Sequence, residues 1–121
     1  MRTTALMSLR ALFLASGVSA AAAVFAHHGW SEYDSSQTLT LTGTIRDSGY
    51  EHPHGHVLLV TPGKTWTAVL APPSRMENRG LPTSALKVGN TVTVVGYPNR
   101  NKPEEMRAER ITADGKTVEL R

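Results

Sequence analysis

The chain has 121 residues, among them 13 lysines and arginines, 10 aspartates and glutamates, 5 histidines and no cysteine. This length suffices for one small domain, and the absence of cysteine excludes disulfides and thiolate metal sites. The formal net charge of +3 is too small to predict binding to nucleic acid.

The first 26 residues have the pattern of a secretory signal peptide. Arg2 and Arg10 supply the positive start, and the apolar run "ALFLASGV" follows them. Val24 and Ala26 satisfy the preference for small residues before a cleavage site. The sequence therefore predicts a signal peptide over residues 1–26 that is removed on export.

Cleavage between Ala26 and His27 would leave one domain over residues 27–121 in the periplasm. Removing the two arginines of the signal from the 13 basic groups leaves 11, against 10 acidic groups. A cut after Ala22 or Ala23 is the alternative. The apolar run before His27 is shorter than the ~20 residues of a spanning helix, so we expect no stable membrane span after cleavage.

Three strands are predicted in the first half of the domain. The segment "QTLTLTGTI" (37–45) alternates strictly between apolar and polar residues, with Gly43 at a bend or bulge. "HVLLVT" (56–61) is continuously apolar, which predicts a strand covered on both faces. "TPGK" (61–64) is typical of a type II turn, and "TWTAVLA" (65–71) completes a hairpin.

The alternating pattern then stops over residues 72–90. Ser74 and Glu77 have the spacing of a capping box, and Gly80 lies where a short helix would end. This segment therefore predicts one short helix between the third and fourth strands.

Strands are predicted again at 91–97 and 105–113, and "DGK" (114–116) predicts a hairpin turn into a last strand at 117–120. Three strands, a short helix and two or three further strands are the order of a small Greek-key barrel. The predicted fold is all-β, an OB-like barrel of five to six strands with one short helix. A β-sandwich is the alternative.

The histidines are concentrated in two short segments, one at the expected mature N-terminus and one before the second strand. They are His27 and His28, and then His52, His54 and His56. Imidazole is the usual neutral nitrogen ligand for copper, zinc and nickel. Side chains two positions apart on an extended chain point the same way, which would let the last two share one ion.

These histidines support the prediction of a transition-metal site, with Cu(II) the first choice and Zn(II) the second. If cleavage follows Ala26, His27 offers its α-amine and its imidazole together, and His28 adds a second ring. His54 or His56 would complete the site, with His52 as an auxiliary ligand. The alternative is that both segments are polar surface, or that His54 caps main-chain groups at the start of a strand.

Other residues are weaker candidates. Glu32 and Asp34 could supply oxygen ligands or orient a histidine, while Trp30 is expected to be a core or rim aromatic. Arg75 and Arg79 are four apart and could bind an anion, although such a pair is more often a solvated helix face. No nucleophile–base pair, phosphate loop or pair of carboxylates is visible, so the sequence predicts no enzyme.

The rival function is a metal-free binding module. OB-like barrels commonly bind oligosaccharides or peptides on the face of their second and third strands. Trp66, Tyr97 and Arg79 would serve such a ligand, and a protein of the cell envelope is a further possible partner.

A run of motifs resembles one family of small exported bacterial proteins catalogued as a domain of unknown function. The matching segments are "HHGW" (27–30), "EYD" (32–34), "TLTLTGT" (38–44), "HPH" (52–54), "RG" (79–80), "LKVGNTVTVVGY" (86–97) and "RAERITADGK" (107–116). His27, His28 and His54 fit the family pattern, whereas His52 replaces an asparagine and His56 is additional. The resemblance implies an OB-like barrel in the periplasm and no particular activity.

Overall fold

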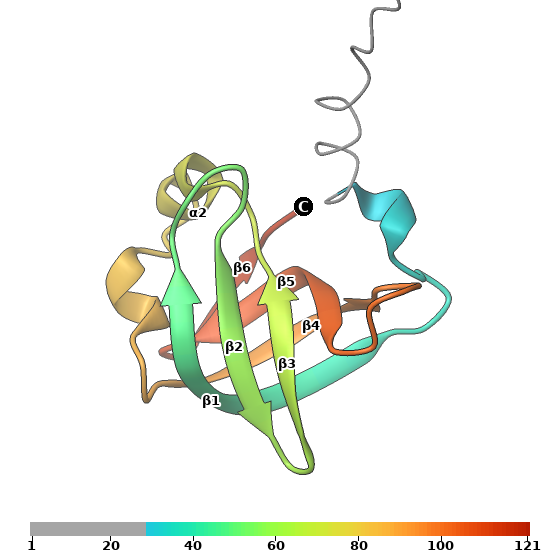
Figure 1. Cartoon of the computed structure of the whole chain (residues 1–121). Helices are drawn as coiled ribbons and strands as arrows, with labels where there is room; N and C mark the ends of the chain where they lie inside the picture. The colour runs from blue at the N-terminus through green and yellow to red at the C-terminus, as the bar shows by residue number, and fades with distance from the viewer. Residues whose placement is uncertain (1–28) are drawn as a thin grey trace, which may run out of the picture.

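The computed structural model describes residues 29–121 (Figure 1). The predicted signal peptide, His27 and His28 lie outside the described residues. Between Gly29 and Arg121, no helix has both the length and the apolar character needed to cross a membrane.

Six strands form one curved sheet that closes on itself (Figure 1). They are β1 (Leu39–Gly49), β2 (His56–Thr61), β3 (Lys64–Val69), β4 (Thr91–Pro98), β5 (Glu105–Ala113) and β6 (Lys116–Glu119). The strand order is β3-β2-β1-β4-β5-β6, and an additional parallel pairing of β3 with β5 closes a five-stranded barrel. The strand β6 extends the sheet beyond β5. The predicted all-β barrel is confirmed.

The long strand β1 bends so that it belongs to both halves of the barrel. Its first half pairs with β4, its second half pairs with β2, and Thr44 pairs with both neighbours. A Cβ atom on Gly43 would lie 2.3 Å from the carbonyl oxygen of Val60. The register shift of β1 lies between Ile45 and Asp47, so the bend or bulge predicted at Gly43 stays a prediction. Close approach of the neighbouring strand explains why glycine occupies position 43.

The strand β2 buries only one of its faces. Val57 and Leu59 are fully buried, whereas Leu58 is partly exposed and Val60 is 40% exposed. The prediction that this strand is covered on both faces was therefore wrong. Antiparallel strands commonly have one face on the core and one toward solvent, even where the outer positions are apolar.

The turns agree with the residues that occupy them. Gly63, in the turn between β2 and β3, has a φ of +79°, as the third residue of a type II turn requires. Asp114 and Gly115 both have positive φ, 51° and 75°, which is the conformation that a two-residue type I′ hairpin turn needs.

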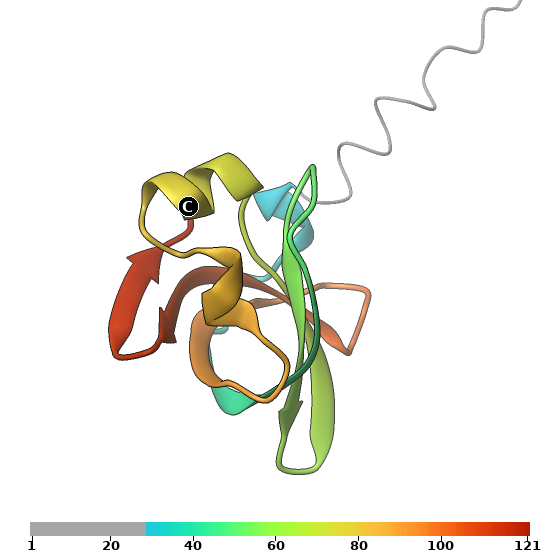
Figure 2. The ribbon, with the colours of Figure 1, turned by 90° about the vertical axis from the view of Figure 1, so that its left-hand side faces the viewer.

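Three short helices accompany the barrel: η1 (Trp30–Glu32), α2 (Pro73–Asn78) and η2 (Thr83–Leu86). Figure 2 shows α2 lying over one end of the barrel. The N-cap of α2 is Pro72, with no side-chain cap, so the predicted capping box of Ser74 and Glu77 was wrong. Proline is well suited to the first turn of a helix, and it moves Ser74 inside the helix. Gly80, with a φ of +85°, follows the helix as predicted.

The core fills the barrel and reaches under α2. Alternate residues of the strands point inward, and Met76 of α2 is fully buried against them. Leu81, which precedes η2, and Leu86, its last residue, belong to the same cluster. Burying an aliphatic side chain of this size contributes about 1.5–3 kcal/mol, so the segment between β3 and β4 is part of the core.

Candidate functional site

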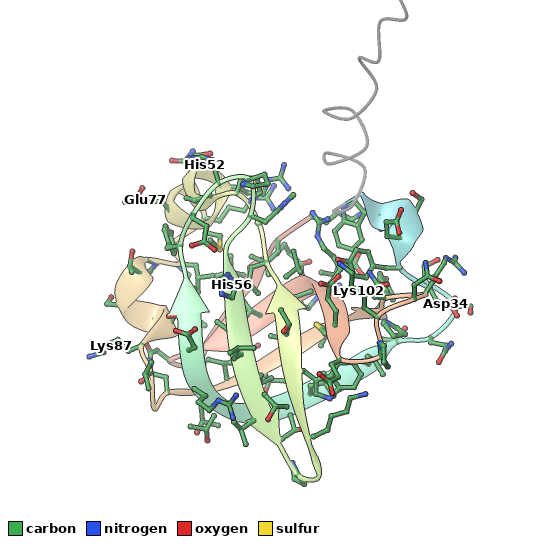
Figure 3. The ribbon with its side chains drawn as sticks, in the orientation of Figure 1. Asp34, His52, His56, Glu77, Lys87 and Lys102 are labelled. Atoms are coloured by element: carbon green, nitrogen blue, oxygen red, sulfur yellow. The ribbon has the colours of Figure 1, made fainter. Side chains whose placement is uncertain are left out.

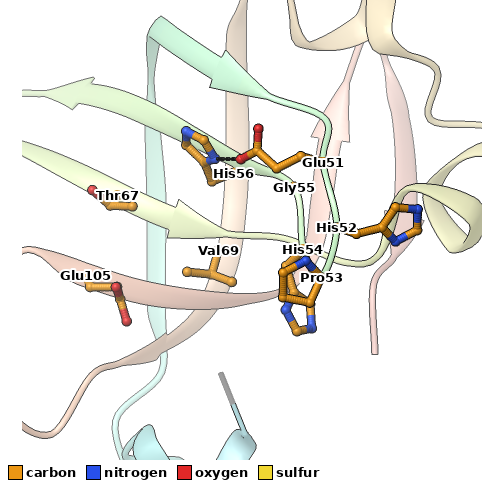
Figure 4. A pocket seen from close by; sticks show the side chains of 9 residues that line it. All are labelled: Glu51, His52, Pro53, His54, Gly55, His56, Thr67, Val69 and Glu105. Carbon is orange, nitrogen blue, oxygen red and sulfur yellow. Dashed lines mark ion pairs between the residues drawn. The ribbon is translucent and has the colours of Figure 1, made fainter. Parts of the chain in front are cut away.

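A groove lies on the outside of the barrel between the loop 50–55 and the loop 99–104. One cavity of about 330 Å³ lies beside the first loop (Figure 4). It is lined by Glu51, His52, Pro53, His54, Gly55, His56, Thr67, Val69 and Glu105. A second cavity of about 340 Å³ shares Thr67 and Glu105 with the first and continues to residues 101–104. We call these two adjoining cavities the groove.

His54 is held in the groove by Arg107 of β5. The Arg107 Nη2 atom donates a hydrogen bond to His54 Nε2 at 3.0 Å. Because a guanidinium group has only donors, Nε2 must be the acceptor, so the ring is neutral and carries its proton on Nδ1. Arg107 is only 3% exposed. Burial lowers the pKa of Arg107, and the charges of Arg75 and Arg121 lower it further.

Trp30 connects the start of the described chain to the same arginine. The Cζ atoms of Arg107 and Arg121 each lie 4.5 Å from the centre of the Trp30 ring, and the ring of Tyr97 meets it edge-on at 6.2 Å. Cation–π contacts contribute about 0.5–1 kcal/mol at exposed sites and about 2 when desolvated. Arg107 therefore links Trp30 to His54, which lines the groove.

Glu105 is the acidic counterpart of these cations. Its Oε2 atom accepts a hydrogen bond from Tyr33 Oη at 2.7 Å and another from Asn99 Nδ2 at 3.0 Å. Tyr33 is 1% exposed. Burial raises the pKa of Tyr33 well above its ordinary value, and the bond to Glu105 raises it further. One carboxylate oxygen of Glu105 is thus fixed by two donors while the residue lines the groove.

The protein should resist tyrosine ionisation in its native state. All three tyrosines have a pKa above the ordinary 10.0: Tyr33 and Tyr50 through burial, and Tyr97 through its hydrogen bond to Glu109. A raised folded-state pKa stabilises the fold while the phenol is neutral, so this stabilisation is fully present below pH 10 and is lost as the pH rises further. We expect phenolate absorbance to appear at higher pH in native than in denatured protein. Coincident titration curves would contradict this expectation.

The other two histidines of the loop have different surroundings. His56 Nδ1 lies 2.8 Å from Glu51 Oε1, and a Cβ atom on Gly49 would be 2.4 Å from the His56 ring. His52 is exposed and points away from both (Figure 4). The structure therefore does not bring His52, His54 and His56 together around one point.

No three histidine, aspartate or glutamate side chains between residues 29 and 121 are arranged to hold a metal ion. The two other predicted ligands, His27 and His28, lie outside the described residues. Within the described chain, the groove is lined by three histidines, His52, His54 and His56, and by three carboxylates, those of Glu51, Glu104 and Glu105.

Asp34 and Glu32 do not orient any histidine of the described chain. Asp34 accepts hydrogen bonds from Ser36 Oγ at 2.6 Å and from Gln37 Nε2 at 2.7 Å, and these bonds lower the pKa of Asp34. Glu32 accepts a main-chain bond from Arg100. Figure 3 shows Asp34 at the right edge of the molecule, away from His52 and His56. Asp34 therefore stabilises the turn before β1.

The residues predicted for a metal-free ligand lie outside the groove. Trp66 packs against the core, with Lys64 Nζ 4.0 Å from its ring centre. Tyr97 contacts Trp30, and Arg79 donates hydrogen bonds to main-chain oxygens near the end of the chain. None of Trp66, Tyr97 and Arg79 lines the groove.

Sequence reasoning missed the polar network beneath the groove. Arg107 and Glu105 alternate along β5 with the buried Met106 and Ala108, a pattern that predicts charged side chains facing solvent. Only the contacts of Trp30 and His54 with Arg107 reveal that the charged position is covered.

Comparison with known proteins gives a family but no curated relative. Residues 15–106 match the model of a family described as "Family of unknown function (DUF6152)". No curated protein matches the chain. Similar solved structures include a crystal structure of TiaS in complex with tRNA and ATP, with 18% identity, a TM-score of 0.49, and coverage of 74% of this chain and 20% of that one. Another is the crystal structure of the ZRD-deleted mutant of TiaS in complex with agmatine, with 19% identity, a TM-score of 0.47, and coverage of 73% of this chain and 25% of that one. This chain thus spans about a quarter or less of each TiaS chain.

Proposed function

Because the chain belongs to the DUF6152 family, whose description assigns no activity, we propose a function from the geometry of the site. The protein is exported to the periplasm, loses its signal peptide after Ala26, and binds one transition-metal ion. Cu(II) is the first choice and Zn(II) the second. The ligands are the amine and imidazole of His27, the imidazole of His28, and His54. The role is carriage or sensing of the metal.

The link that Arg107 makes between Trp30 and His54 is the observation that supports this proposal. Arg107 contacts the Trp30 ring and bonds to the His54 ring. His28 precedes Trp30 by two residues in the sequence. The proposed N-terminal ligands therefore belong to the segment that leads into Trp30, which Arg107 links to His54.

The chemical form of His54 also fits a metal ligand. A neutral imidazole is the form that coordinates a metal, and the bond from Arg107 already fixes the neutral ring. Ligation by the neutral ring would use the Nε2 lone pair, would displace the Arg107 N–H from it, and would leave the proton on Nδ1. Nitrogen ligands without thiolate suit copper and zinc.

The test is intact-mass measurement of the exported protein under native conditions after addition of one equivalent of Cu(II). We expect a chain that begins at His27 and retains one copper ion. His54→Ala should lose the ion, whereas the matched control His52→Ala should keep it, because His52 is exposed and points away from His54. Equal retention by both variants would exclude His54 as a ligand. Failure of the wild-type protein to retain copper would exclude the proposed copper site.

A metal-free binding function is the second candidate, and the groove is the observation that favours it. The two cavities share Thr67 and Glu105 and lie over β3 beside the flanking loops. Carboxylates and histidines line the groove, so a polar ligand such as an oligosaccharide or a peptide would suit it. A wild-type protein without retained copper would leave this function as the better supported one.

A further inference from the structure

The surface of α2 carries a separate cavity, away from the groove. This cavity has a volume of about 320 Å³ and is lined by Pro72, Ser74, Arg75, Asn78 and Arg79. Residues four apart lie on the same face of a helix, so Ser74 and Asn78 form one row beside Arg75 and Arg79. A hydroxyl, an amide and two guanidinium groups line the cavity, and no carboxylate of the described chain does.

The two guanidinium groups are held in place by main-chain oxygens. Arg75 Nη1 donates to the Leu120 oxygen at 3.0 Å. Arg79 Nη1 donates to the oxygens of Glu119 at 2.8 Å and of Arg121 at 3.0 Å. An arginine carries five N–H donors, and these bonds leave several of them on each side chain. The same contacts that attach α2 to the end of β6 therefore fix two donor groups beside the cavity.

No aspartate or glutamate side chain between residues 29 and 121 is within ion-pair distance of Arg75 or Arg79. The one acidic group that either arginine contacts is the oxygen of Arg121, at the end of the chain, which accepts from Arg79. Glu77 belongs to the same helix but does not line the cavity. The positive charge of Arg75 also acts on Arg107, whose pKa it lowers. An anion in the cavity would reduce this repulsion between like charges.

We propose that this cavity binds the phosphate group of a small molecule or of a lipid head group. Arg75 and Arg79 supply charged N–H donors, which match phosphate oxygens in pairs. The Ser74 hydroxyl and the Asn78 amide add neutral donors. The site is independent of the proposed metal site, because none of its residues lines the groove.

Ser74→Glu provides a test that leaves both arginines in place. The new carboxylate would lie beside Arg75 and Arg79 and would compete with phosphate for their N–H groups. A negative charge in the first turn of a helix is favourable, so the fold should not be weakened. Ser84→Glu is the matched control: Ser84 is exposed in η2 and receives the same charge outside the cavity.

Binding is measured by NMR titration with inorganic phosphate and by co-sedimentation with phosphatidylglycerol vesicles, both at low ionic strength. We expect a saturable response to at least one probe, with phosphate shifting the resonances of residues 72–79. Ser74→Glu should weaken that response about ten-fold or more, equivalent to about 1.4 kcal/mol, and Ser84→Glu should preserve it. The probe that responds identifies the source of the phosphate. No response to either probe, or an equal response from both variants, would overturn the proposal.

Discussion

Gly96→Ala is expected to destabilise the protein by about 3 kcal/mol or more. Gly96 lies on β4 opposite Ala108 of β5, where the strand pairing shifts register. A Cβ atom there would be 1.8 Å from the main-chain oxygen of Arg107 and 2.8 Å from the Cα atom of Ala108. Both neighbours are backbone, so rotation of a side chain cannot relieve the overlap. The two strands would have to separate at this point of the barrel.

Urea denaturation of the wild-type protein and of Gly96→Ala measures this loss of unfolding free energy. Gly63→Ala is the appropriate comparison, because Gly63 has no heavy atom within 4 Å of an added Cβ but has a φ of +79°. Its expected cost is only about 1–2 kcal/mol, that of a left-handed conformation for an ordinary residue. If Gly96→Ala were no more destabilising than Gly63→Ala, the close approach of β4 and β5 at this point would be refuted.

Arg107→Ala is expected to cost about 3 kcal/mol. Arg107 is buried, bonds to His54 and contacts the ring of Trp30. Its charge also lies near the carboxylate of Glu105. Removal of the guanidinium would leave a cavity and would take the positive charge away from a partly buried carboxylate. It would also release η1 from the loop before β2. Both the stability of the whole domain and the local stability of η1 should therefore fall.

The matched control is Arg110→Ala, three residues along the same strand. Arg110 pairs with Glu119 at 2.9 Å, but its side chain is 38% exposed, and exposed ion pairs contribute only about 0–1 kcal/mol. In thermal denaturation, the Tm of Arg107→Ala should therefore be well below that of Arg110→Ala. Hydrogen exchange at residues 30–33 should accelerate only in the Arg107 variant. Unchanged exchange there would show that Arg107 does not hold η1 against the barrel.

The sequence by itself determined the elements and their order. Alternation of apolar and polar residues located β4 and β5 to within one residue, and the glycines of the turns marked where the chain reverses. These features are local, because a period of two and a positive φ depend on neighbouring residues alone. Two local inferences failed: β2 is exposed on one face, and Pro72 rather than Ser74 caps α2. The apolar run of β2 did not show that one of its faces is left uncovered by the fold. The helix start had two local candidates, Pro72 and Ser74, and the structure has Pro72.

Only the tertiary structure determined how the candidate site is assembled. His54 and Arg107 are 53 residues apart in the chain, and the parallel pairing of β3 with β5 brings their segments together. The groove, the burial of Arg107 and the closeness of Gly96 to β5 all depend on this closure. No short stretch of sequence contains the register of two distant strands, because that register follows from the packing of the whole barrel. The histidine clusters identified candidate ligands, and the fold then linked His54 to Trp30 through the buried Arg107.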